Sequence, residues 1–379
     1  MGARGGIGPD TVGCVGTLAM PVVWAPGSDA HRVTSGVWCG VSIDADELPE
    51  RSHVLLEACR ESGAPIHEAV DHGLDALLAV HEPRFLSVLE SAHERWVADG
   101  HLEDPGAPYA IAYWFPAVAG RHGGDPDRAA ATIRAELGRY AMDTMTPVGE
   151  GTWAGAKAAS DAAATASDLV LAGAPAAYAI CRPPGHHAGP GFFGGSCYLN
   201  NAAVAAARLR RGGASTVAIV DIDAHHGNGT QACFWDDPSV LYCSLHVDPG
   251  AGWFPHTVGY ADEVDRPATN HNRPLPPGTG DLRWLDTIDG LVQIIERFAP
   301  EAVVVSLGVD TAVEDPNSPF EVTAEGFAAA GRRIGELSRP TVLVHEGGYV
   351  LATLAGHTLA VLDGFEATAG APPTPMTAR

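Results

Sequence analysis

Two carboxylates and an imidazole alternate in the segment Asp221-Ile222-Asp223-Ala224-His225. In an extended strand, residues two apart point to the same face, so Asp221, Asp223 and His225 are expected to converge. Such a group repels itself unless a cation lies within it, and its oxygen and nitrogen atoms suit zinc, with iron(II) or cobalt(II) also tolerated. Asp310 is the natural further ligand, and three protein ligands leave positions for water and substrate. The plainer alternative is a strand that ends in ordinary polar caps.

Two further motifs carry groups suited to proton transfer and charge stabilisation. His186 and His187 follow a Pro-Pro-Gly turn, and two adjacent imidazoles near a metal can divide acid and base work. Tyr349 follows Gly347 and Gly348, a flexible turn from which its hydroxyl can donate to a developing oxyanion. Taken singly, the histidines also fit a surface turn and the tyrosine fits simple packing.

The elements that must position these residues alternate along the chain. The predicted strands are the apolar runs Ala176–Cys181, Thr216–Ile222, Val240–Leu245, Ala302–Leu307 and Thr341–His345, with a strand-like start at Val22–Trp24. The predicted helices are Glu47–Arg60, Gly73–Trp96, 152–173, Asn201–Arg211, Trp284–Phe298 and Ala324–Leu337. Continuous apolar strands that alternate with helices predict an α/β fold, with a mostly parallel sheet covered on both faces. Ligands bind beyond the carboxyl ends of such strands, where these five runs end in polar residues.

The composition excludes several classes of protein. The chain has 379 residues, with 23 Lys and Arg against 46 Asp and Glu, so no basic face is available for nucleic acid. No uncharged apolar stretch reaches the roughly 18 residues of a membrane helix. Seven cysteines without paired spacing indicate reduced thiols. Residues 1–19 make a poor signal peptide and are interpreted as an extension without a fold, which favours a cytoplasmic protein.

Several motifs together resemble the histone deacetylase superfamily. In order these are R-P-P-G-H-H-A at 182–188, D-I-D-A-H-H-G-N-G-T-Q at 221–231, S-L-G-V-D-T at 306–311 and E-G-G-Y at 346–349. The segments at 71–81, 146–153 and 272–280 resemble its bacterial acetylpolyamine amidohydrolase branch. The resemblance extends from about Met20 to the C-terminus. It implies an arginase-like three-layer fold, a single domain over 20–379, and removal of acetyl from a small cationic amine by a metal-activated water.

The resemblance also implies catalytic roles. His187 would act as general base and then as acid, His186 would stabilise charge, and Tyr349 would donate to the oxyanion. Asp221 would orient His186, and Asn228 would orient His187. Because an aspartate raises the pKa of a histidine more than a neutral asparagine does, His187 is expected to be the better base at neutral pH.

The resemblance further implies two kinds of bound cation. Zinc would be held by Asp223, His225 and Asp310. One structural potassium ion would share Asp221, Asp223 and His225 with Ser244 and Leu245. A second potassium site would comprise Phe234, Asp237 and Val240.

The substrate channel departs from the family pattern. Its expected residues are Ser196, Trp253, Phe254, Gly195, Asn317 and Gly347. Many relatives carry an aromatic residue at the position of Ser196, and the rim position of Asn317 is usually apolar. A wider and more polar channel favours a bulkier or more oxygenated acetamide, such as a secondary metabolite. The alternative is that Phe192 or Phe193 fills the gap.

Residues 100–128 form a long irregular segment, where the acetylpolyamine branch has a loop insertion that joins two subunits. The resemblance therefore implies a homodimer through this loop. The loop carboxylates that offer partners for a second ammonium group are Glu103, Asp104, Asp125 and Asp127. The rival functions are a protein acetyl-lysine deacetylase, a ureohydrolase, which needs two metal ions, and a non-catalytic binding module. Such a module would be expected to lack a ligand, the base or the tyrosine, and all of these are present.

Overall fold

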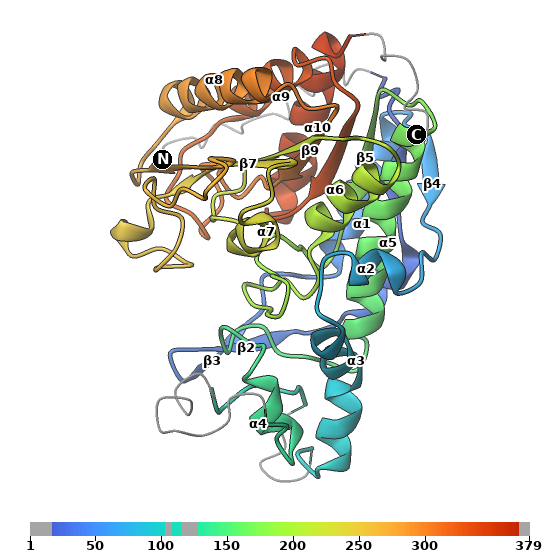
Figure 1. Ribbon diagram of the computed structural model, residues 1–379, viewed down its shortest axis with the longest axis vertical. Coiled ribbons are helices and arrows are strands. Elements are labelled where there is room, and N and C mark those ends of the chain that lie inside the picture. Colours follow the sequence, from blue (N-terminus) through green and yellow to red (C-terminus); the bar gives the residue numbers. More distant parts are fainter. Residues whose placement is uncertain (1–16, 103–107, 116–127, 371–379) are drawn as a thin grey trace, which may run out of the picture.

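The computed structural model describes residues 17–102, 108–115 and 128–370, and its centre is an eight-stranded sheet (Figure 1). The strand order is β4-β1-β5-β10-β9-β6-β7-β8, and all neighbouring strands in it are parallel. The strands are β1 (Val22–Trp24), β4 (Ile66–Glu68), β5 (Ala176–Ile180), β6 (Val217–Asp221), β7 (Val240–Val247), β8 (Asn270–Leu275), β9 (Ala302–Leu307) and β10 (Thr341–His345). The predicted α/β fold with a parallel sheet is confirmed.

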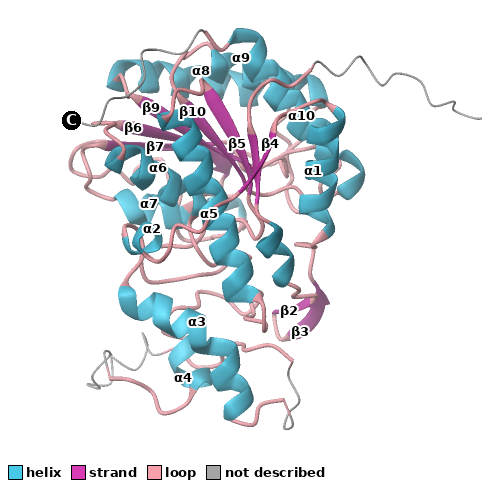
Figure 2. Ribbon diagram, turned by 90° about the vertical axis from the view of Figure 1, so that its right-hand side faces the viewer, coloured by secondary structure: helices cyan, strands magenta, loops and turns pink. Residues whose placement is uncertain are grey.

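Helices cover both faces of this sheet, as Figure 2 shows. The hydrophobic cluster on one face includes α1 (Glu50–Glu61), α8 (Asp281–Phe298), α9 (Ala324–Gly335) and α10 (Leu351–Thr368), and that on the other includes α5 (Thr152–Leu171) and α6 (Asn201–Arg211). Along β6, Val217 and Ile219 pack on the α5–α6 side, whereas Ala218 and Val220 pack on the opposite side. Both faces are buried, and this is why the strands are apolar throughout.

A smaller layer lies below the sheet in Figure 1. It contains α2 (Asp75–Leu78), α3 (Pro83–Ala98), α4 (Ile133–Leu137) and an antiparallel hairpin of β2 (Ser35–Trp38) and β3 (Val41–Asp44). Phe85 of α3 packs against Tyr140 and Phe193 in a third hydrophobic cluster. The helix α5 belongs to two clusters. Its residues Ala156 and Ala164 pack in this third cluster, whereas neighbouring alanines of α5 pack against the face of the sheet that α5 and α6 cover.

The hairpin turns at Cys39 and Gly40, whose φ angles are 49° and 82°. A two-residue turn with positive φ at both positions is the type I′ turn, which matches the twist of the flanking strands. This hairpin is not among the predicted elements. The sequence feature that could have revealed the hairpin is the pair Cys39-Gly40 between two short strand-like runs.

The helix predicted over Gly73–Trp96 is interrupted, so this prediction is wrong in one respect. Glu82 is extended, and Pro83, which has no N–H to donate, begins α3. Just before this break, the buried His81 accepts a hydrogen bond from Asn200 N at 3.0 Å through Nε2 and donates to Gly189 O at 2.9 Å through Nδ1. Through these two hydrogen bonds, His81 attaches the smaller layer to the loop that follows β5.

The remaining elements are short or were not predicted. They are α7 (Asn228–Phe234), the 3-10 helices Pro26–Ala30 and Pro249–Ala251, and the unpredicted β4, β8 and α10. In the ranges that the structure describes, no helix is long and apolar enough to cross a membrane. The six cysteines within these ranges are free thiols.

The N-terminal boundary needs a correction. Leu18, assigned to an unfolded extension, is fully buried in the main hydrophobic cluster, and its N–H donates to Ser62 O at 3.0 Å. Ala19 N donates to Glu366 Oε1 at 3.0 Å. The folded chain therefore includes Leu18 and Ala19, while residues 1–16 lie outside the described residues.

Candidate active site

The ends of the central strands bring the predicted site residues together. In the register of the sheet, Asp221 at the end of β6 lies beside Ser244 of β7 and Ser306 of β9. The residues that follow these parallel strands therefore meet at one edge. The prediction of a single strand face is wrong, because β6 ends at Asp221 and Asp223 and His225 lie on the following loop.

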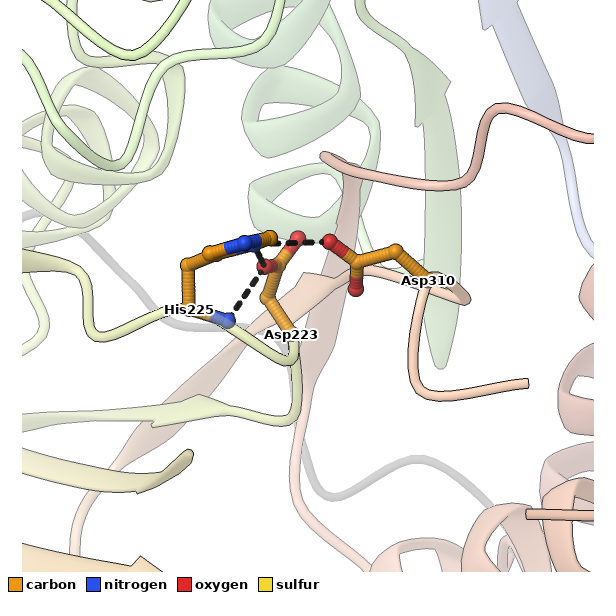
Figure 3. A group of neighbouring side chains, drawn as sticks. All are labelled: Asp223, His225 and Asp310. Carbon is orange, nitrogen blue, oxygen red and sulfur yellow. Dashed lines mark hydrogen bonds and ion pairs between the residues drawn. The ribbon is translucent and has the colours of Figure 1, made fainter. Parts of the chain in front are cut away.

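Asp223, His225 and Asp310 form a compact group at this edge (Figure 3). Each offers one ligand atom, and these atoms lie within 4.8 Å of one another. His225 Nδ1 is 3.3 Å from Asp223 Oδ1 and 3.0 Å from Asp310 Oδ2. The backbone holds both carboxylates, since Gly347 N donates to Asp223 Oδ2 and Ala224 N donates to Asp310 Oδ1. These are the three residues predicted to hold zinc, and the fold brings them within coordination range of one ion.

The electrostatics of this group fit a cation. Burial and the charge of Asp223 raise the pKa of Asp310 to about 7, against the opposing effect of His225. Burial disfavours the charged form of His225, but hydrogen bonds to Asp223 and Asp310 and their charges raise its pKa to about 10. The two buried carboxylates therefore stabilise positive charge placed beside them. Two oxygen donors and one nitrogen donor in a buried setting suit zinc or a similar divalent ion.

The adjacent histidines lie beside this group, with ring centroids 4.1 Å apart. His186 Nδ1 is 3.0 Å from Asp221 Oδ2, and His187 Nδ1 is 2.7 Å from Asn228 Oδ1. These oxygens accept hydrogen bonds, so each Nδ1 donates and carries a proton. The unprotonated nitrogen of His187, which can accept a proton, is then Nε2. The pairs that the sequence analysis named are in contact.

The two histidines differ in protonation. Burial lowers the pKa of His187 well below its usual value, and the positive charges of His186 and His225 act in the same direction. Burial also disfavours the charged form of His186, but the charges of Asp223 and Asp221 outweigh it and raise the pKa well above its usual value. At neutral pH, His187 is therefore a neutral base beside the cationic His186.

Tyr349 reaches the same place from the segment after β10. Its backbone N–H donates to Asp315 Oδ2 at 2.7 Å, and the guanidinium of Arg51 lies over its ring, 4.8 Å from the centroid. Burial raises the pKa of Tyr349 well above its usual value, and this effect outweighs the charge of Arg51, which acts to lower the pKa; the charges of Asp310 and Asp223 also act to raise it. The hydroxyl therefore stays protonated and able to donate a hydrogen bond.

A cavity of about 410 Å³ is lined by His187, His225 and Tyr349. Five of the predicted channel residues also line it: Gly195, Ser196, Trp253, Phe254 and Asn317. Gly347 is not among the residues that line it, and its assignment to the channel stays a prediction. A Cβ atom at Gly347 would lie 2.5 Å from Asp310 Oδ2, which places this glycine against the candidate metal ligands instead.

The glycine-rich loop forms a close wall of the cavity. Gly195 and Ser196 have φ angles of 56° and 63°. A Cβ atom at Gly195 would lie 2.4 Å from His187 Cδ2 and 2.9 Å from the Phe254 ring. Only glycine therefore lets the loop approach the base this closely.

The alternative in which Phe192 or Phe193 replaces the missing aromatic residue is wrong. Neither lines the cavity, and Phe193 is buried in the third hydrophobic cluster. The side chain of Ser196 thus leaves this part of the wall small and polar.

One wall of the cavity consists of residues that were not predicted from the sequence. The hairpin and the residues after it contribute Gly36, Trp38, Ile43, Asp44, Ala45, Asp46 and Glu47. Trp38 is 47 % exposed, and Asp44 and Asp46 are exposed carboxylates. The mouth of the cavity therefore combines an aromatic ring with negative charge, two features that attract an ammonium group.

The potassium sites and the loop carboxylates stay predictions. Ser244 and Leu245 are buried in β7, and Ser244 Oγ is 2.8 Å from His246 Nδ1. The carbonyl of Phe234 accepts from Asp237 N, and that of Asp237 accepts from Val240 N. The four acidic residues of the 100–128 loop, Glu103, Asp104, Asp125 and Asp127, lie outside the described residues.

Comparison with known proteins shows the family of this chain. The histone deacetylase domain model matches residues 46–365. Acetylpolyamine amidohydrolase 1 of Pseudomonas aeruginosa is 39% identical over 90% of this chain and 98% of its own length, and acetylpolyamine amidohydrolase of Mycoplana ramosa is 37% identical over 91% and 99%. The crystal structure of acetylpolyamine aminohydrolase from Burkholderia pseudomallei aligns with a TM-score of 0.87 at 36% identity, covering 93% of this chain and 100% of that one. The chain therefore belongs to the histone deacetylase family and is a hydrolase of its acetylpolyamine amidohydrolase-like branch.

Proposed function

We propose that this chain removes acetyl from the amine of a small cationic molecule. The observation that carries the proposal is the meeting of a neutral histidine, a candidate metal group and a protonated tyrosine at one cavity. The relatives named as acetylpolyamine amidohydrolases support an acetylated polyamine as the substrate. The cytoplasm is the proposed location.

Asp223, His225 and Asp310 would hold the metal ion, with zinc as the first choice and iron(II) or cobalt(II) as alternatives. When bound, such an ion acts as a Lewis acid toward a carbonyl and lowers the pKa of water. We also propose that the structural potassium ions occupy the two sites named above.

The proton moves through His187. With Nδ1–H held by Asn228, Nε2 accepts the proton of the attacking water as its oxygen bonds to the acetyl carbon. The tetrahedral oxyanion that forms accepts a hydrogen bond from the Tyr349 hydroxyl, while the cationic His186, held by Asp221, stabilises the negative charge. His187 then returns its proton to the amine nitrogen as the C–N bond breaks, and the remaining hydroxyl proton also passes to the amine, which yields acetate and the protonated amine.

Asp44 and Asp46 at the cavity favour a cationic substrate over a neutral one. Ser196 and Asn317 favour some added bulk or oxygen in that substrate, so a larger N-acetylated metabolite is the second candidate. A protein acetyl-lysine deacetylase is the third.

The first experiment compares kcat/KM of the zinc-loaded protein on N-acetylputrescine and on an acetyl-lysine peptide, with Tyr349→Phe as the blank. The proposal expects a strong preference for the polyamine and loss of that activity in the variant. Turnover of the peptide alone would overturn the proposed substrate. Turnover of neither compound would direct the search to bulkier acetamides.

We also propose a single domain over residues 20–379, with Leu18 and Ala19 packed on it, that forms a homodimer through the loop at 100–128. Light scattering with activity measured on the same fractions tests the dimer. A fully active monomer would contradict it.

A further inference from the structure

Glu346, which begins the E-G-G-Y motif, is a buried carboxyl group with no part in the chemistry described above. It follows β10 directly and is 0 % exposed. Its Oε2 accepts a hydrogen bond from Gly185 N at 2.7 Å and another from His186 N at 3.1 Å. Its Oε1 accepts from Ser306 Oγ of β9 at 3.3 Å. One side chain thus joins the strand end after β10 to the turn that carries both histidines.

The backbone of Glu346 is fixed from the opposite direction. Arg51 Nη2 donates to Glu346 O at 2.5 Å, and Arg51 Nε donates to Gly348 O at 2.7 Å. The backbone N–H of Glu346 donates to Leu307 O at 2.8 Å. The segment that ends in Tyr349 is therefore held by Arg51, and its first side chain holds the histidine turn.

We propose that Glu346 is a positioning residue that sets the spacing between the base His187 and the oxyanion donor Tyr349. It acts through the backbone of Gly185 and His186, and touches neither substrate nor metal. This inference rests on the proposed function for its kinetic test, but its structural test does not. Misplacement of a reacting group by about 1 Å can lower a rate about a hundredfold, so a small shift of this turn has a measurable effect.

The length of the Glu346 side chain, and not its charge, is the property that the positioning role requires. Burial raises the pKa of Glu346 to about 7, against the opposing charge of His186, so its negative charge is already incomplete at neutral pH. Gln has the same length and keeps an oxygen acceptor for both N–H groups. Asp keeps the carboxylate but is one methylene shorter and cannot span the same gap.

The test compares Glu346→Gln and Glu346→Asp in the zinc-loaded protein. We expect Glu346→Asp to lower kcat about a hundredfold with little change in KM, and Glu346→Gln to recover most of the loss. An effect of charge alone predicts the reverse order. Equal loss in both variants, or the reverse order, would overturn the proposal.

Asp265 supplies a matched control. It is also a buried carboxylate, and it accepts two backbone N–H groups, from Thr269 at 2.7 Å and Asn270 at 3.0 Å, and one hydroxyl, from Thr269 Oγ1 at 2.6 Å. It does not line the cavity. Asp265→Asn and Asp265→Glu should leave kcat unchanged.

Hydrogen exchange gives a readout that needs no substrate. In Glu346→Asp, the peptide that contains Gly185 and His186 should exchange faster than in the wild type, whereas in Glu346→Gln it should not. Unchanged exchange in Glu346→Asp would contradict the proposal even if kcat fell. If the wild type turned over no acetylated amine, the proposed function would fail while this measurement still decided the role of Glu346.

Discussion

The floor of the cavity and one wall of its mouth are built from opposite kinds of structure. At the floor, His225 lines the cavity, and the carboxylates in contact with it, Asp223 and Asp310, are at most 1 % exposed and are held by backbone N–H groups. At the mouth, β2 and β3 pair with each other in a separate two-stranded sheet, and Trp38 is 47 % exposed. The floor sits at the edge of a sheet buried on both faces, so its geometry is fixed by many strands at once. The difference indicates that the reaction chemistry depends on the edge of the large sheet, whereas substrate choice depends on the separate β2–β3 hairpin.

Loss of a floor ligand should have the largest effect. Asp310→Ala is expected to lower kcat/KM about a thousandfold, because a Lewis acid supplies several kcal/mol of transition-state stabilisation. The same variant should lose bound metal by elemental analysis while keeping a wild-type circular dichroism spectrum. Full metal content with low activity would point to a different ligand set.

A change beside the base should shift the pH profile. In Asn228→Asp, a carboxylate would replace the neutral partner of His187, so the pKa of His187 should rise. Because the base acts when deprotonated, activity would be lost at the acid end and retained at the alkaline end. We expect kcat/KM about tenfold below wild type near pH 6, measured from about pH 5 to pH 9. An unmoved acid limb would mean that His187 is not the base.

Ser196→Tyr tests the wall between floor and mouth. The aromatic ring of Tyr should narrow the cavity. The ratio of kcat/KM for N-acetylputrescine to that for a bulkier acetamide should then rise about tenfold. Unchanged relative kcat/KM would remove Ser196 from substrate selection.

The hairpin should respond least. In Asp44→Asn with Asp46→Asn, KM for N-acetylputrescine should rise about fivefold at most, because exposed ion pairs contribute up to about 1 kcal/mol. N-butylacetamide, a neutral substrate of similar length, is the control and should be unaffected. The KM difference should shrink at high salt. An equal effect on both substrates would show that these carboxylates shape the wall without binding the ammonium group.

The same division explains what the sequence revealed. Asp223 and His225 stand in one short motif, and the apolar runs before them and before Asp310 predict a common sheet edge, so the floor was predictable. The wall containing Trp38 and Asp44 was missed because it comes from a short, exposed hairpin with little hydrophobic pattern. Glu346 was missed although its motif was recognised, because its contacts with Gly185 and His186 depend on a side chain crossing between two strands.

The helix α5 has a consequence for folding. Its alanines pack both under the sheet and in the third hydrophobic cluster, which contains α3 and α4. If the smaller layer unfolded alone, the alanines of α5 that pack in the third cluster would be exposed, although the same helix also packs against the sheet. The two layers are therefore expected to unfold together, in one cooperative thermal transition, and protease cleavage between them should be slow until that transition begins.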